Sequence, residues 1–141
     1  MSGNMRPVIE SDFPIIRTNL LKIQEKNPAR QMVQATIEPA MAYVEQAVKE
    51  NRCYIVDDTF FVMFDVGSLW FSNEKFLLEQ LVMRISPNNF HVGNAVQALT
   101  ELAKFHGATR IVSGDTQLGL MTKHYLADGY EPLGTQLIKE I

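Results

Sequence analysis

Two side chains in the second half of the chain are suited to moving protons, Tyr125 and Glu79. A phenol has a reference pKa of about 10, so the hydroxyl of Tyr125 can donate a proton or a hydrogen bond to a leaving group that develops negative charge. The carboxylate of Glu79 can accept a proton, directly or through water, if it faces the same cleft. Each residue also has a simpler interpretation. Tyr125 would be a core residue on a helix face shared with Leu118 and Met121, and Glu79 a polar residue on the solvated side of a strand.

The histidines and the cysteine predict little further chemistry. His91, His106 and His124 have no metal-ligand spacing, and no carboxylate pattern joins them, so the sequence predicts no metal site. His106 ends a predicted helix, where the helix dipole favours a cation. His124 lies about 100° around its helix from Tyr125 and is predicted to be on the surface. Cys53 is the single cysteine, which excludes an internal disulfide and favours a small buried hydrophobe.

The composition is typical of one soluble globular domain. The chain has 141 residues, of which 46% are hydrophobic and 21% charged, so we expect a single domain over residues 1–141 with a substantial core. Its 13 basic and 16 acidic residues give a net charge of −3 without a basic cluster, which disfavours nucleic acid as a partner. No apolar run reaches the roughly 18 residues of a membrane span, and no signal peptide is evident. These properties predict a cytoplasmic protein with no membrane partner.

The first half of the chain predicts a strand, two helices and a hairpin. Apolar residues three and four apart, Phe13, Ile16, Leu20 and Ile23, predict the first helix. Pro39 either begins the second helix or kinks it away from an earlier turn at residues 30–36. Leu69–Phe71 either continue the second hairpin strand or form a bulge in it. The predicted elements are a strand over Met5–Ile9, the two helices to about Asn51, and hairpin strands over Cys53–Val56 and Thr59–Val66 around Asp57-Asp58.

The second half predicts a strand, a helix and a second strand in immediate succession. Such a unit makes a right-handed crossover between parallel strands. The turn at residues 86–93 then lies at the carboxyl end of a strand and the amino end of a helix, where anionic ligands tend to bind. The fold class is therefore α/β with a mixed sheet, antiparallel at its start and parallel at its centre. The predicted elements are Phe76–Ile85, Asn94–His106, Thr109–Ser113, Gln117–Asp128 and terminal strands within Pro132–Ile141.

Four stretches in this order resemble the GNAT-type N-acetyltransferases. They are MRPVIESDFP, FLLEQLVMRISP, AVQALTELAKFHGATRIVSGD and HYLADGYEPLGTQLIKEI, and they cover nearly the whole chain. The last stretch has a tyrosine followed four residues later by a glycine and an aromatic residue, which Tyr125, Gly129 and Tyr130 match. In its compactness the chain is also similar to small GNAT-like proteins of tailed phages, some of them associated with the virion.

The resemblance implies a GNAT-like fold, acetyl-CoA as the cofactor and direct transfer of an acetyl group to an amine. It assigns to Tyr125 the donation of a proton to the departing CoA thiolate, and Glu79 would deprotonate the attacking amine. It also implies that the backbone of Val82, Met83 and Arg84 pairs with the pantetheine arm like an added strand.

The diphosphate loop departs from the family pattern, which is Arg or Gln, two residues, glycine, any residue, and glycine or alanine. Glycine lets the backbone approach a diphosphate and adopt positive φ. Counting back from Ala103 puts Val92 or Gly93 at the last glycine position, with Phe90 or His91 at the first. Asparagine tolerates left-handed backbone and could partly replace glycine, and a histidine could donate to phosphate. The residues predicted to contact the diphosphate are Asn88, Asn89, His91, Val92, Gly93 and Asn94.

Three functions follow from these patterns. The first is an acetyl-CoA-dependent N-acetyltransferase that acts on a small-molecule or protein amine. The second is a GNAT-fold interaction or virion-assembly protein that has lost CoA, which the glycine-poor loop favours. An exposed part of the aromatic-rich region at residues 60–71 would then serve a homodimer or a protein partner. The third is a sensor that binds CoA without transferring an acetyl group.

Overall fold

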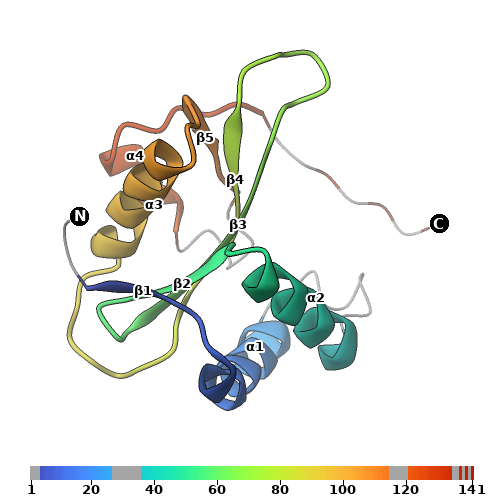
Figure 1. Ribbon diagram of the computed structural model, residues 1–141, viewed down its shortest axis with the longest axis vertical. Helices are drawn as coiled ribbons and strands as arrows, with labels where there is room; N and C mark the ends of the chain where they lie inside the picture. The colour runs from blue at the N-terminus through green and yellow to red at the C-terminus, as the bar shows by residue number, and fades with distance from the viewer. Residues whose placement is uncertain (1–3, 27–35, 115–120, 135–136, 138, 140) are drawn as a thin grey trace.

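The computed structural model describes residues 4–26, 36–114, 121–134, 137, 139 and 141, which form a mixed α/β fold (Figure 1). Five strands build one sheet in chain order. The first four pair antiparallel and β5 pairs parallel with β4, which confirms the predicted fold class. The strands are β1 (Met5–Pro7), β2 (Cys53–Val56), β3 (Phe60–Gly67), β4 (Phe76–Arg84) and β5 (Arg110–Val112).

Helices cover both faces of the sheet (Figure 1). Two of them pack together on one face, and the other two lie on the opposite face beside β4 and β5. Among the described residues, no helix has the length and apolar character needed to cross a membrane. The helices are α1 (Phe13–Lys26), α2 (Ile37–Lys49), α3 (Gly93–Phe105) and α4 (Thr122–Ala127).

The predicted stripe of α1 and the alternating residues of β4 belong to one core. Ile16 and Leu20 are buried in the same cluster as Met83 and Ile85. Leu81 is partly buried against this cluster. The expected core between the first helix and the central strand is therefore confirmed. A second cluster fills the space between the sheet and α3.

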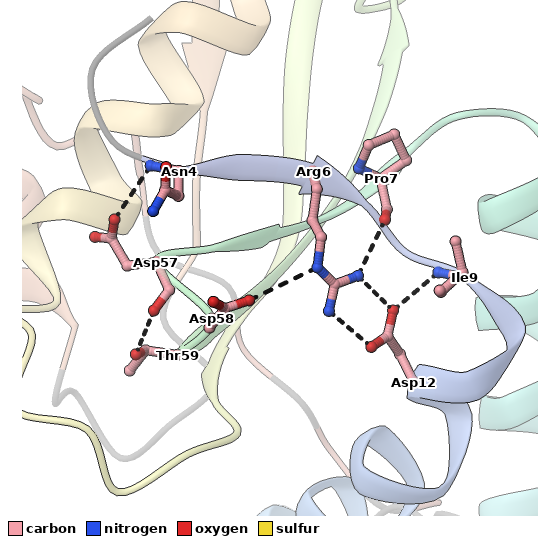
Figure 2. Close-up of polar contacts among 8 residues, drawn as sticks. All are labelled: Asn4, Arg6, Pro7, Ile9, Asp12, Asp57, Asp58 and Thr59. Atoms are coloured by element: carbon pink, nitrogen blue, oxygen red, sulfur yellow. Dashed lines mark hydrogen bonds and ion pairs between the residues drawn. The ribbon is translucent and has the colours of Figure 1, made fainter.

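The first strand is shorter than predicted, because the chain turns after Pro7. Arg6 donates hydrogen bonds of 2.8 and 2.9 Å to Asp12, and Asp12 also accepts the amide of Ile9 at 2.9 Å (Figure 2). The Val8 amide still donates to the Cys53 carbonyl of β2 at 3.1 Å, and the Asp12 contacts then hold the chain in a short 3₁₀ turn (Glu10–Asp12) that leads into α1. The prediction of a strand to Ile9 was therefore wrong by two residues.

The beginning of α2 settles the role of Pro39. The helix starts at Ile37 with Thr36 at the N-cap position, so Pro39 lies in its first turn. A proline is tolerated there because the amides of the first turn have no partner within the helix. Of the alternative turn at residues 30–36, only Thr36 is among the described residues.

The hairpin of β2 and β3 is confirmed, and Val56 pairs with Phe60, so its turn has three residues. Asp57 and Asp58 adopt φ of 54° and 50° in this turn, and the Thr59 amide donates to the Val56 carbonyl at 3.0 Å. Leu69–Phe71 neither continue β3 nor form a bulge, which corrects both alternatives. β3 ends at Gly67, and the chain then makes a turn in which the Ser72 amide donates to the Leu69 carbonyl at 3.0 Å.

The last third of the chain follows the prediction as far as α4. The predicted helix and strand correspond to α3 and β5, and α4 covers the described part of the predicted helix at residues 117–128. Residues 115–120 lie outside the described residues. The terminal strands predicted within residues 132–141 are wrong for the part that the structure describes, since 132–134, 137, 139 and 141 belong to no strand. Pro132 cannot donate to a ladder and Gly134 disfavours a strand, which disrupts the start of that segment.

Candidate active site

A β-bulge in β4 lies where the predicted site residues are found. Met63 of β3 pairs with Leu81, but the neighbouring Phe64 pairs with Glu79, so Gln80 is an extra residue in β4. A bulge bends its strand and changes which face of the sheet its alternate residues occupy. The parallel ladder between β4 and β5 ends two residues before this bulge. The two strands therefore stop pairing at the point where β4 bends.

Tyr125 borders a cavity of about 660 Å³ beside β5. The residue lies on α4, is only 6% exposed, and packs with Met121 in the cluster under α3. Leu118, the third residue of the predicted helix face, lies outside the described residues. Burial confirms Tyr125 as a core residue, and its place on the cavity wall is compatible with the predicted catalytic role. Other residues of the wall include Leu69, Phe71, Phe76, Val112 and Tyr130.

Tyr130 joins Tyr125 on this wall, with the ring centroids 5.0 Å apart. Burial raises the pKa of Tyr130 to about 12, and the negative charge of Glu79 adds to the rise. Glu79 is half-buried, so it is not simply a solvated strand residue, but it is not among the described residues that line the cavity. The structure thus places Glu79 within electrostatic reach of Tyr130. The sequence analysis had used Tyr130 only as part of a motif.

The first amides of α3 already have hydrogen-bond partners. The Gly93 amide donates to Nδ1 of His91 at 2.9 Å, and the Asn94 amide donates to the carbonyl of His91 at 3.0 Å. The Ala95 amide donates to the carbonyl of Val92 at 2.9 Å. A Cβ on residue 93 would lie 2.7 Å from Nδ1 of His91, so glycine allows the imidazole to close over the amide. The imidazole of His91, which precedes the N-cap residue Val92, therefore accepts the first amide of the helix that was predicted to face the diphosphate.

A carboxylate also lies at the start of α3. Asp57, only 8% exposed, accepts a hydrogen bond from Nδ2 of Asn94 at 3.1 Å and one from the amide of Asn4 at 3.4 Å. Figure 2 shows its contacts with Asn4 and Thr59. A negative charge is favourable near a helix amino end, where it would compete with a bound phosphate. In the sequence Asp57 is recognisable only as a turn residue, because no local signal links it to Asn94, 37 positions away.

The asparagines of the loop do not replace glycine in the way that was predicted. Among the described residues, φ is positive outside glycine at three positions, and none of them is Asn88, Asn89 or Asn94. The loop is held instead by a side chain of β4. Arg84 donates to the carbonyl of Asn88 at 2.6 Å and to the carbonyl of Phe90 at 2.8 Å.

The start of α3 favours another register for the family's loop pattern. With Gly93 at the first glycine position, Ala95 takes the glycine-or-alanine position and Phe90 the place of Arg or Gln. Gly93 is the first residue of α3, and Ala95 is fully buried where a small residue is needed. Counting back from Ala103 had assigned Val92 or Gly93 to the last glycine position. The overlooked signal was the alanine two residues after Gly93.

His91 and His124 line a second cavity, of about 190 Å³, between the start of α3 and α4. Their ring centroids are 5.3 Å apart in an edge-to-face arrangement. The small desolvation of His124 lowers its pKa, and the charges of Lys123 and His91 act in the same direction. His124 was predicted to lie on the surface, yet it is half-buried and contacts the loop. This contact joins the loop to the helix that carries Tyr125.

Neither a metal site nor the cysteine adds further chemistry to the described part of the chain. The part of the chain that the structure describes holds no group of three or more His, Cys, Asp or Glu arranged for a metal ion. Cys53 is 1% exposed, and burial raises the pKa of its thiol to about 12. The prediction of a small buried hydrophobe is confirmed.

Several solved structures have the same fold as this protein over almost the whole chain. A GCN5-related N-acetyltransferase from Ralstonia eutropha JMP134 matches with a TM-score of 0.71 and 12% identity, covering 98% of this chain and 97% of that chain. AAC(6')-Iy, in complex with the bisubstrate analog CoA-S-monomethyl-acetylneamine, matches with a TM-score of 0.68 and 9% identity, covering 100% and 99%. The chain has the GNAT fold. At these identities the likeness shows the fold alone.

The GNAT fold does not by itself specify an activity. A transcriptional regulator from Bacillus halodurans C-125 matches with a TM-score of 0.69 and 13% identity, covering 99% of both chains. No model of a known protein family matches the sequence, and neither does any curated protein. The resemblance to phage-encoded GNAT-like proteins stays a prediction.

Proposed function

We propose that this protein is an acetyl-CoA-dependent N-acetyltransferase that transfers the acetyl group directly to an amine. The observation that carries the proposal is the position of Tyr125 on the wall of a 660 Å³ cavity, beside the strands β4 and β5. A neighbour with the same fold, AAC(6')-Iy, forms a complex with an analogue that combines CoA with an acetylated amine. That complex supports CoA and an amine as the substrates of this fold.

In the proposed reaction the amine nitrogen attacks the thioester carbonyl carbon. The new C–N bond forms as the C–S bond breaks, and the sulfur leaves as a thiolate. Tyr125 donates its phenolic proton to that sulfur, whose thiol has a pKa comparable to the 8.5 or so of cysteine. Glu79 accepts the proton lost by the amine, directly or through water. Proton exchange with solvent then restores both side chains.

The remaining residues of the proposed site bind the cofactor. The backbone of Val82, Met83 and Arg84 extends β4 beyond the end of its ladder with β5, where an amide-containing arm can lie alongside it. The diphosphate would lie at the amino end of α3, where backbone amides and the helix dipole favour an anion. The loop residues assigned to it are Asn88, Asn89, His91, Val92, Gly93 and Asn94.

A second candidate is an interaction module that no longer binds CoA. The specific observation in its favour is that His91 and Asp57 already satisfy groups at the start of α3. The side chains of Trp70 and Phe71 are 95% and 63% exposed, and they offer an aromatic surface to a second copy or another protein.

A thermal-shift titration with acetyl-CoA distinguishes the two candidates. Ligand at about 100 times its dissociation constant should stabilise the native state by roughly 2.7 kcal/mol, which raises the melting temperature measurably. Desulfo-CoA should largely reproduce the shift, and adenine should not. The absence of a shift at millimolar acetyl-CoA would favour the interaction module.

A further inference from the structure

The loop between β4 and α3 is held from within by the side chain of Arg84. Its Nη1 donates to the carbonyl of Asn88 at 2.6 Å, and its Nη2 donates to the carbonyl of Phe90 at 2.8 Å. The planar fork of a guanidinium can make two such bonds at once, whereas the point charge of a lysine cannot match this geometry. One side chain thus fixes two carbonyls that are two residues apart.

The guanidinium itself has a defined place in the fold. Its Cζ lies 4.8 Å from the ring centroid of Phe60, a distance typical of a cation–π contact. Phe60 is fully buried in β3 and pairs directly with Arg84 across the sheet. The core of the domain therefore sets the position of the charge that holds the loop.

The two bonds determine where the loop amides point. In a trans peptide the N–H points opposite to the C=O, so the amides of Asn89 and His91 point away from Arg84. Backbone N–H groups that are turned away from the guanidinium in this way are oriented to donate to an anion outside the loop. The positive charge also polarises both peptide groups, which strengthens their N–H groups as donors.

We propose that Arg84 is a positioning residue that shapes this loop for the diphosphate of CoA. The proposal rests on the proposed function, because it assigns a role within the same cofactor site. Arg84 orients the amides of Asn89 and His91, a task that glycine backbone performs in the family's usual loop. Its side chain acts through the loop carbonyls and does not itself contact the diphosphate.

The test compares Arg84→Met, Arg84→Lys and a control, Arg17→Gln, by NMR titration with two ligands. Arg17 is an exposed arginine of α1, on the opposite face of the sheet, so the control removes one charge without touching the loop. The ligands are CoA and pantetheine, which lacks the diphosphate and the nucleotide. The spectra report dissociation constants and also the amide signals of Asn89 and His91.

In the wild type, CoA should shift the amide signals of Asn89 and His91. Arg84→Met should weaken CoA binding by about 10-fold or more and leave pantetheine binding unchanged. Arg84→Lys should bind CoA almost as weakly as Arg84→Met does. Arg17→Gln should bind both ligands with the affinity of the wild type.

Three results would overturn the role of Arg84 while leaving the proposed function in place. The first is an Arg84→Met variant that binds CoA as tightly as the wild type. The second is an Arg84→Lys variant whose CoA affinity equals that of the wild type. The third is an Arg84→Met variant that loses affinity for CoA and pantetheine by the same factor. The failure of wild-type protein to bind CoA would instead overturn the proposed function itself, and the role of Arg84 with it.

Discussion

Replacing His91 with alanine should tighten CoA binding, because the imidazole occupies an amide that a phosphate oxygen needs. Nδ1 of His91 accepts the Gly93 amide at 2.9 Å, and the ring contacts His124 at 5.3 Å between centroids. A hydrogen bond of this kind contributes about 1 kcal/mol, and an exposed ring contact about 0.5 kcal/mol. A ligand that displaces the imidazole loses both. Their removal should lower the dissociation constant of CoA by roughly 10-fold.

The same substitution should destabilise the free protein. The imidazole of His91 accepts the first amide of α3, and loss of such a hydrogen bond costs about 1 kcal/mol. For a domain of this size the melting temperature should fall by about 4 °C. A variant that is less stable alone but binds CoA more tightly is hard to explain except by competition between the imidazole and the ligand.

Isothermal titration calorimetry with CoA measures the affinity, and differential scanning calorimetry measures the stability of the free protein. The matched control is His124→Ala, which removes the ring contact and keeps the hydrogen bond, so its affinity should change by only about 2-fold. Weaker CoA binding in His91→Ala would refute the reasoning. His91 would then donate to the diphosphate, as the sequence alone allows.

Three further predictions concern the reaction and the fold. Tyr125→Phe should lower the turnover number in an acetyltransferase assay by on the order of 10²-fold, while the affinity for acetyl-CoA measured by calorimetry stays the same. An unchanged turnover number would mean that Tyr125 is a core residue only. Arg6 donates two hydrogen bonds to Asp12 and holds the pKa of that carboxyl below its usual value, so the stabilisation is present at neutral pH and is lost as the pH falls through the folded-state value. The difference in urea stability between wild type and Asp12→Asn should therefore shrink below about pH 4, and a constant difference would contradict the assignment. Phe61→Ala, at a fully buried site, should cost about 3–5 kcal/mol of unfolding free energy, whereas Leu126→Ala, at a site 49% exposed, should cost less than about 1 kcal/mol.

Local patterns were sufficient to predict most of the secondary structure. The spacing of Ile16 and Leu20 predicted the buried face of α1, because residues three and four apart share one side of a helix. Asp57-Asp58 between two β-rich runs predicted the hairpin, because aspartate tolerates the positive φ that both residues adopt in its turn. The order of these elements predicted the mixed sheet and the parallel β4–β5 pair.

The contacts around the candidate site could not be predicted, because they depend on partners far apart in the chain. Nothing in the sequence around Gln80 marks it as an extra residue, since a bulge is defined only by pairing with β3. The carboxylate of Asp57 reaches Asn94 only after the hairpin and α3 have packed on the same sheet.

Residue types and their spacing by themselves determined the fold class, the buried face of α1 and the candidate tyrosine of this protein. Only the tertiary structure decided which group lies at the start of α3 and what holds the preceding loop. The sequence assigned Arg84 to the cofactor only through its backbone, but the fold places its guanidinium against Phe60 and within hydrogen-bond distance of two loop carbonyls. The physical reason is that periodicity reports which side of an element is buried, whereas a hydrogen bond requires two atoms to meet in space.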